Sequence, residues 1–322
     1  MTGGKAIGEF DLIAQYLAPL AGEGAFGLTD DAALLSDGLI VTKDLLVAGT
    51  HFFADDPLDS VAQKALRVNI SDLAAKGCQP TVYFLGLVWP READEAAVAA
   101  FAKGLALDQN AYGLTLLGGD TTRHAKDGMP LTISITMAGR PLEGAPVLRR
   151  GAQPGDTLLV TGTIGDGYLG LEARKAGSSD SAGAAFYLRP RPPFALVEAI
   201  AQHAHAALDV SDGLVADASH LAKASGVGVH LNGAAVPLSE AGETWVSERG
   251  EEGLKALLTG GDDYQCLMAV SPDAVPAIFE EAATQGVRLT AIGSCVAGPA
   301  CVIVDGPEGD PLTFPLGGFQ HF

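Results

Sequence analysis

Aspartates beside glycines recur along this chain at the ends of short apolar segments. The set comprises Asp30, Asp31, Asp44, Asp120, Asp209, Asp212, Asp262 and Asp263. Each one alone fits an ordinary turn or helix cap, since aspartate bonds readily to nearby backbone N–H groups. Sheets of α/β proteins, however, bind their ligands at the ends of strands. The repeated placement therefore predicts that these carboxylates share one site.

Several carboxylates can meet in one site only if cations lie between them. Two of them about 4 Å apart repel by about 4 kcal/mol at an effective dielectric constant near 20. Asp72 adds a further acid in a segment of helical spacing, with Asn69 one turn before it and Lys76 one turn after it. Because no Cys/His cluster accompanies the acids, oxygen ligation favours Mg²⁺. Mg²⁺ usually completes its shell with water and substrate phosphate, so the pattern predicts magnesium–phosphate chemistry.

Two other motifs are weaker indicators. Gly165-x-Gly167-x-x-Gly170 follows an expected strand and opens an expected helix, as dinucleotide-binding turns do. Residues 171–200 then resemble a helix, a Ser/Gly stretch and a proline loop, without the second strand that such a site needs. The P-loop pattern GxxxxGK[ST] does not occur in the sequence. His203-x-His205 lacks a third metal ligand at suitable spacing, so we interpret both histidines as residues at a helix end.

Composition excludes several classes of function. The 322 residues carry a net charge of −19, which argues against binding to a nucleic-acid backbone. The hydrophobic fraction of 48% provides ample material for buried cores, yet no apolar run approaches the roughly 20 residues of a membrane span. The first residues lack an export signal, and the four cysteines show no CxxC spacing. We therefore expect a soluble cytoplasmic enzyme that binds neither nucleic acid nor membrane.

Hydrophobic spacing predicts an α/β (α+β) protein in which each half has a sheet covered by helices. Helices are expected at 9–17, 56–76, 92–111, 194–206 and 214–224, and strands at 32–35, 39–42, 82–88, 114–117, 131–138, 157–160, 207–210, 227–231, 264–270 and 289–292. A Gly/Pro-rich passage at 139–155 is the expected boundary. It predicts an N-terminal domain of residues 1–145, which holds the Mg/ATP aspartates, and a C-terminal domain of residues 146–322.

Motifs at these residues resemble the thiamine-monophosphate kinase family, in the superfamily of aminoimidazole ribonucleotide synthetase and selenophosphate synthetase. They run in order from end to end of the chain and include Gly8-Glu9-Phe10, Asp30-Asp31-Ala32-Ala33-Leu34-Leu35, Asn69-Ile70-Ser71-Asp72-Leu73-Ala74-Ala75-Lys76-Gly77, Gly118-Gly119-Asp120-Thr121-Thr122, Asp209-Val210-Ser211-Asp212-Gly213-Leu214, Gly260-Gly261-Asp262-Asp263-Tyr264 and Gly318-Phe319-Gln320-His321-Phe322. Taken together they are highly specific.

The resemblance implies ATP-dependent conversion of thiamine monophosphate to thiamine diphosphate by a two-domain aminoimidazole ribonucleotide synthetase-like fold, with mixed sheets and helices packed outside them. It implies a homodimer paired through the N-terminal sheets, with ATP near that junction. The implied Mg²⁺ ligands are Asp30, Thr42, Lys43 (through its backbone), Asp44, Asp72, Asp120, Asp209 and Asp212, of which Asp44, Asp72 and Asp120 would be catalytic through the metal. The implied ATP contacts are Gly119, Asp120, Arg149 and Ser211, and the thiamine-side contacts are His51, Asp262 and Phe319.

Three residues depart from the family pattern: Lys43 stands where Thr is common, Asp262 where Glu is usual, and Phe319 where Trp or Tyr is usual. Substrate identity is therefore less strongly indicated than Mg–ATP chemistry. Another ATP-using member of the superfamily is the nearest alternative, although the N-terminal Gly3-Gly4-Lys5 segment lacks the cysteine of selenophosphate synthetases. A non-catalytic nucleotide- or thiamine-phosphate-binding module is a second alternative, and the full aspartate set argues against it.

Overall fold

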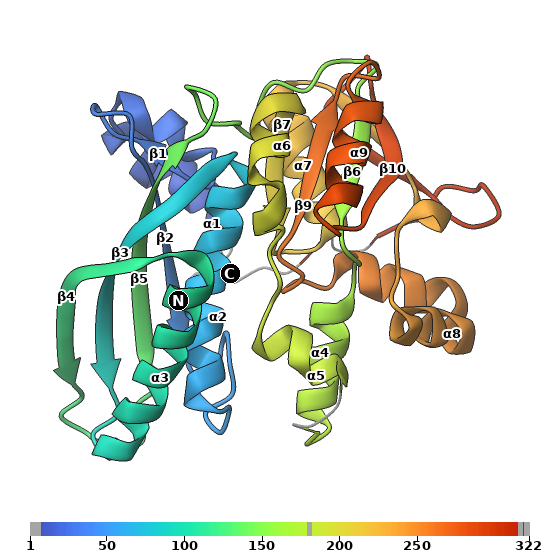
Figure 1. Cartoon of the computed structure of the whole chain (residues 1–322). Helices are drawn as coiled ribbons and strands as arrows, with labels where there is room; N and C mark the ends of the chain where they lie inside the picture. The colour runs from blue at the N-terminus through green and yellow to red at the C-terminus, as the bar shows by residue number, and fades with distance from the viewer. Residues whose placement is uncertain (1–7, 179–181, 315–317, 319–322) are drawn as a thin grey trace, which may run out of the picture.

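Two mixed β-sheets lie side by side, each with its own helices, in the computed structural model (Figure 1). The structure describes residues 8–178, 182–314 and 318. The N-terminal sheet has the strand order β1-β2-β5-β3-β4. Its strands are β1 (Ala33–Leu34), β2 (Ile40–Val47), β3 (Cys78–Trp89), β4 (Thr115–Arg123) and β5 (Thr132–Pro141). The predicted boundary at 145/146 falls in the segment between β5 and β6.

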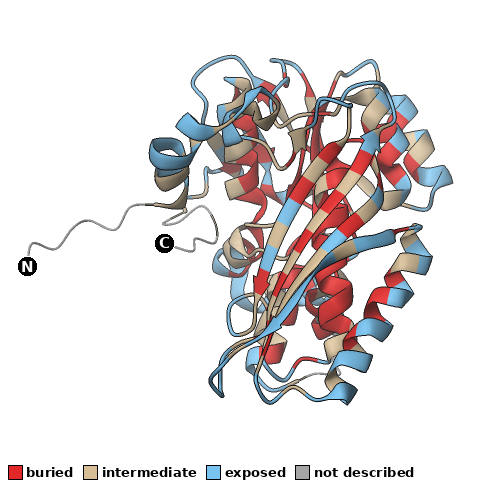
Figure 2. Cartoon of the chain, turned by 90° about the vertical axis from the view of Figure 1, so that its left-hand side faces the viewer, coloured by how far each residue is buried: buried red, intermediate tan, exposed pale blue. Residues whose placement is uncertain are grey.

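One face of the N-terminal sheet packs on α2 (Leu58–Ala75) and α3 (Glu95–Tyr112). Along β5, buried residues such as Ile133 and Ile135 alternate with half-buried ones, as expected for a sheet with a single covered face. Among the described residues no helix covers the opposite face, which Figure 2 shows toward the viewer in bands of red, tan and pale blue. Large apolar side chains on β2 and β3, Leu45 and Phe84, are exposed there. This open face is available to a partner surface.

The second sheet has the order β11-β8-β10-β6-β9-β7, and its inner strands β6 and β9 are almost wholly buried. Its strands are β6 (Thr157–Thr161), β7 (Ala204–Val210), β8 (Gly228–Asn232), β9 (Gln265–Val270), β10 (Leu289–Val296) and β11 (Val302–Asp305). The remaining helices are α1 (Glu9–Leu12), α4 (Asp166–Lys175), α5 (Ala182–Leu188), α6 (Val197–His203), α7 (Leu214–Ser225), α8 (Glu240–Thr259) and α9 (Val275–Thr284). Within the described ranges, no helix is long and apolar enough to cross a membrane.

Helix α2 joins the two halves, because it packs on the N-terminal sheet and also contacts β7 and β9 of the second one (Figure 1). Burial on several sides explains why polar side chains on and just after this helix, including Lys64, Asn69 and Lys76, are withdrawn from solvent. A buried ammonium must find oxygen partners to offset its lost hydration. The positions of those partners define the site described below.

The observed elements differ from the sequence prediction in several of their limits, and α5, α8, α9 and β11 were not predicted. Asp44 and Asp120 lie within β2 and β4 rather than after strand ends, because strands with an open face continue beyond their apolar runs. Asp209 lies within β7, which ends at Val210 as expected but begins earlier, at Ala204. The single helix expected at 194–206 is instead a 3₁₀ turn, the short α6 and the first residues of β7. His205 therefore lies on a strand, where its Nδ1 is 3.0 Å from Asp156 Oδ2.

The glycine motif at residues 165–170 opens α4 as expected, and the next element after α4 is α5, not a strand. The backbone N–H groups of Gly165 and Gly167 donate to the two carboxylate oxygens of Asp263, at 2.8 and 2.9 Å. The helix start therefore binds a carboxylate of the same chain, which agrees with the rejection of a dinucleotide site.

Candidate active site between the two sheets

A cavity of about 280 Å³ lies between the two halves of the chain. Its walls come from β2, α2 and the 50–51 turn on one side, and from α4, α5, β7 and the 261–264 loop on the other. Its polar and aromatic lining consists of Asp44, Thr50, His51, Asp72, Tyr187, Asp209, Ser211, Asp212, Asp262 and Tyr264. Four of the predicted magnesium ligands and both described thiamine-side residues thus face a single space.

Three carboxylates from distant parts of the chain converge beside this cavity. One oxygen each of Asp31, Asp72 and Asp209 lies within 4.8 Å of the others. Asp31 precedes β1, Asp72 is on α2 and Asp209 is near the end of β7. Thr42 on β2 adds a hydroxyl whose Oγ1 is 2.5 Å from Asp72 Oδ2. The donor set contains only oxygen atoms, as Mg²⁺ prefers.

The electrostatics of these carboxylates fit a divalent cation. Burial, together with the charge of Asp31, raises the pKa of Asp44 to about 6 and that of Asp209 to about 7. Burial also raises the pKa of Asp72 well above its usual value, and the charges of Asp44 and Asp209 add to this. Carboxylates that hold protons near neutral pH do so because no positive charge stabilises their ionised forms. A bound metal ion would supply that charge and displace the protons.

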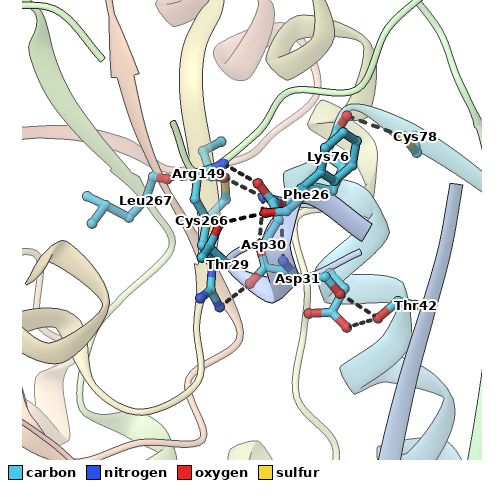
Figure 3. A network of polar contacts seen from close by, with 12 residues as sticks. Phe26, Thr29, Asp30, Asp31, Thr42, Lys76, Cys78, Arg149, Cys266 and Leu267 are labelled. Atoms are coloured by element: carbon cyan, nitrogen blue, oxygen red, sulfur yellow. Dashed lines mark hydrogen bonds and ion pairs between the residues drawn. The ribbon is translucent and has the colours of Figure 1, made fainter. Parts of the chain in front are cut away.

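Asp30 and the neighbouring Asp31 are held by two basic side chains (Figure 3). Lys76 Nζ lies 2.9 Å from Asp30 Oδ1, 2.6 Å from Asp31 Oδ2 and 2.7 Å from the Ala207 carbonyl oxygen. The Arg149 guanidinium pairs with Asp31, and the Arg149 backbone N–H donates to Asp30 at 2.8 Å. Burial alone would raise the pKa of Asp31, but Arg149 and Lys76 hold it at about 2. Asp31 is therefore the anchored member of the cluster, and Asp30 shares Lys76 with it without joining the three clustered carboxylates.

The other end of the cavity combines aromatic rings with one carboxylate. Asp262 Oδ1 accepts the Tyr264 hydroxyl at 3.0 Å and lies 3.2 Å from Lys64 Nζ. His51 Nδ1 accepts the Val47 backbone N–H at 3.0 Å, so Nε2 carries the proton of the neutral ring.

A second acidic group adjoins the cavity at the start of α7. One carboxylate oxygen of Asp217 accepts the backbone N–H groups of Ser211 and Asp212, both at 3.1 Å. Ligand atoms of Asp212, Asp217 and His220 lie within 4.8 Å of one another. Asp217 therefore fixes the backbone that presents the predicted residues Ser211 and Asp212.

Some predicted residues lie elsewhere. Gly119 and Asp120 are on β4, the outermost strand of the N-terminal sheet, and Asp120 is exposed. Side chains of β2 alternate between the two faces of the sheet, and Lys43 lies on the open face, where its Nζ is 2.6 Å from Ser134 Oγ. Phe319 lies outside the described residues.

Asp31 belongs to the acidic cluster, as the recurring aspartates predicted, although the resemblance implied its neighbour Asp30 as the metal ligand. Sequence reasoning overlooked three other side chains of this site. Tyr187 and Tyr264 line the cavity, and Tyr264 directly follows the Gly-Gly-Asp-Asp motif, which could have identified it. Lys64 lies within a regular helix, where no sequence feature distinguished it.

Family models match most of the chain. The N-terminal domain of AIR synthase related protein matches residues 29–140, and its C-terminal domain matches residues 153–306. Among curated relatives, the thiamine-monophosphate kinase of Caulobacter vibrioides is 46% identical over 90% of this chain and 84% of its own length. The Escherichia coli enzyme of that name is 37% identical over 98% of this chain and 99% of its own length.

Solved structures share this architecture. One described as AaThiL complexed with AMPPCP and TMP superposes with a TM-score of 0.86 at 28% identity, covering 100% of both chains. Thiamine monophosphate kinase from Aquifex aeolicus gives 0.80 at 29% identity, over 95% of this chain and 97% of that one. A chain of a structure described as a HypE-HypF complex gives 0.76 at 21% identity, over 94% of this chain and 98% of that one, and is similar in fold alone.

Proposed function

The chain belongs to the AIR synthase related family, among its thiamine-monophosphate kinases, and we propose from this that it transfers the terminal phosphoryl group of ATP to thiamine monophosphate. The products are thiamine diphosphate and ADP. One observation supports this proposal above all: the carboxylates of Asp44, Asp72 and Asp209 and the residues His51 and Asp262 line the same cavity. A phosphate-binding end and an organic end are thereby joined in one space.

The acceptor is a phosphate oxygen, which is already ionised at neutral pH. A general base is therefore not required, and catalysis depends on positioning and on neutralising charge. Asp31, Asp44, Asp72 and Asp209 would hold Mg²⁺, which would neutralise the phosphates of both substrates. Thr42 orients the Asp72 carboxylate, while Lys76 and Arg149 keep Asp31 ionised. We assign the ATP side to Arg149 and Ser211, and the thiamine side to His51 and Asp262.

Asp120 and Gly119 enter this proposal only through a second copy of the chain. Asp120 is on β4 and Asp44 on β2, three strand spacings apart in the sheet order, which is about 14 Å. Magnesium–oxygen bonds are about 2.1 Å long, so the two side chains of one chain cannot bind the same ion. A homodimer paired through the open sheet face would supply Asp120 to the partner's site. The two-domain division at 145/146 and a cytoplasmic location stay predictions.

The assay that tests the function measures ADP released from ATP with thiamine monophosphate, and separately with thiamine. We expect ADP and thiamine diphosphate in equal amounts with thiamine monophosphate and Mg²⁺, and neither product after chelation. Asp72→Asn should lose most of kcat, because it removes a carboxylate of the metal cluster, while the chain stays folded by circular dichroism. Asp305→Asn, on β11 away from the cavity, is the matched control. ADP release without thiamine diphosphate, or normal turnover of Asp72→Asn, would contradict the proposal.

A further inference from the structure

A buried lysine lies directly behind the thiamine-side wall of the cavity. Only 2% of the Lys64 side chain is exposed, and Lys64 is absent from the cavity lining. Its Nζ is 3.0 Å from the His51 carbonyl oxygen, 3.2 Å from Asp262 Oδ1 and 3.7 Å from the centre of the Tyr187 ring. All three of these partners line the cavity. One side chain therefore contacts three separate parts of that wall.

The ammonium group has three N–H donors, and these three partners match them in number. Removing an ammonium from water costs several kcal/mol unless its donors are satisfied, so the partners stay in place as a set. Two further hydrogen bonds close the network. The Tyr187 hydroxyl donates to the same His51 carbonyl oxygen at 3.1 Å, and the Tyr264 hydroxyl donates to Asp262 Oδ1 at 3.0 Å.

This network leaves one oxygen of Asp262 for a ligand. Oδ1 is occupied by Lys64 and Tyr264, whereas no residue in the described part of the chain donates to Oδ2. The Asp262 side chain is 26% exposed and faces the cavity. Its backbone has φ +70°, a left-handed conformation that is unfavourable outside glycine and persists only where the surroundings fix it. Lys64 contacts the side chain of this residue.

We propose that Lys64 is the positioning residue for recognition of the substrate's organic end, an inference that rests on the proposed function. Lys64 holds Asp262 so that Oδ2 accepts an N–H group of a bound heteroaromatic ring, and it holds the Tyr187 ring as an aromatic wall beside that ring. The aminopyrimidine of thiamine monophosphate carries such an N–H group. Because Lys64 acts on the organic end alone, its removal should change binding of thiamine monophosphate and not binding of ATP.

The first test compares Lys64→Met with the parent enzyme, after the parent has been shown to form thiamine diphosphate. We expect the KM for thiamine monophosphate to rise about tenfold or more, because Asp262 loses the charge-assisted contact that positions it, and the KM for ATP to stay within about twofold. Arg67→Met is the matched control: Arg67 lies one turn further along α2 and pairs with buried Asp108, away from the cavity. It should lower stability and leave both KM values unchanged.

A double-mutant cycle with Asp262→Asn distinguishes positioning from general destabilisation. If Lys64 acts through Asp262, Lys64→Met should raise the KM little further in the Asp262→Asn background. Multiplicative effects of the two changes, or an unchanged KM for thiamine monophosphate in a folded Lys64→Met enzyme, would overturn the proposal. Should Lys64→Met not fold, Lys64→Gln keeps N–H donors on a shorter side chain and should give an intermediate rise. A parent enzyme that forms no thiamine diphosphate would instead refute the proposed function.

Discussion

The carboxylates around the cavity show how far single residues can be predicted. Recurring aspartates indicated a shared oxygen-ligand site, and Asp44, Asp72 and Asp209 do lie together there. Sequence spacing could not distinguish Asp30 from Asp31, because adjacent residues in a loop have no fixed direction. The choice depends on the buried ammonium of Lys76 and the guanidinium of Arg149, which reach the pair from elsewhere in the chain.

The raised pKa values predict how stability depends on pH in the metal-free protein. Asp44 and Asp209 have folded-state pKa values of about 6 and about 7, against 3.8 for the ordinary side chain. Between these values the folded state binds more protons than the unfolded state, so stability falls as pH rises from about 4 to about 7. Mg²⁺ replaces those protons, so it should raise Tm by several degrees more at about pH 8 than at about pH 5.

Differential scanning calorimetry with and without Mg²⁺ checks this expectation. Asp209→Asn removes one of the buried carboxylates whose pKa is raised into this window, so it should make the pH dependence of the metal-free protein shallower. An equal shift of Tm by Mg²⁺ at both pH values would show that the ion does not bind at these carboxylates.

At the scale of elements, the sequence predicted most helices and strands but misjudged where several end. Apolar runs mark the buried part of a strand. β2 and β4 continue beyond those runs through polar residues, which hydrogen bonds to the neighbouring strands still hold. The start of α4 was predicted from its glycines, yet the carboxylate that accepts their backbone N–H groups belongs to Asp263, in a separate motif. Local spacing cannot reveal a contact between residues 165–167 and residue 263.

Asp263 is expected to stabilise both α4 and the cavity loop. Asp263→Ala leaves two buried N–H groups without a partner, at about 1–3 kcal/mol each, so the free energy of unfolding measured in urea should fall by about 2–6 kcal/mol. The loop also holds Asp262 and Tyr264 at positive φ, so the KM for thiamine monophosphate should rise. Asp94→Ala is the control, because it removes an exposed cap of α3 at a cost of about 1 kcal/mol and should leave the KM unchanged. Equal effects of the two variants would exclude a special role for Asp263.

At the scale of the whole molecule, one chain does not bring all the predicted ligands together. Two sheets with helices outside were expected from the alternation of apolar segments, and both are present. The alternation of apolar segments does not indicate which face of a sheet stays uncovered, because that depends on the side of the sheet on which the connecting helices pack. In the N-terminal sheet, Asp120 pairs with Gly86, which in turn pairs with Ser134. Paired residues point to the same face, so Asp120 lies on the open face, opposite to the buried neighbour Ile135. Asp44, paired with Ile135, points the other way, toward α2 and the cavity.

This separation predicts that each complete site takes Asp120 from one chain and Asp72 from its partner. Asp120→Asn and Asp72→Asn should each be nearly inactive alone. Co-refolded together, they should recover about a quarter of parental activity, because about half of the dimers are mixed and each mixed dimer has one intact site of two. Asp44→Asn mixed with Asp72→Asn should recover nothing, since both residues lie in one chain's cavity. Light scattering measures whether the chain is the expected dimer. Failure of Asp120→Asn and Asp72→Asn to complement each other would place Asp120 outside the site.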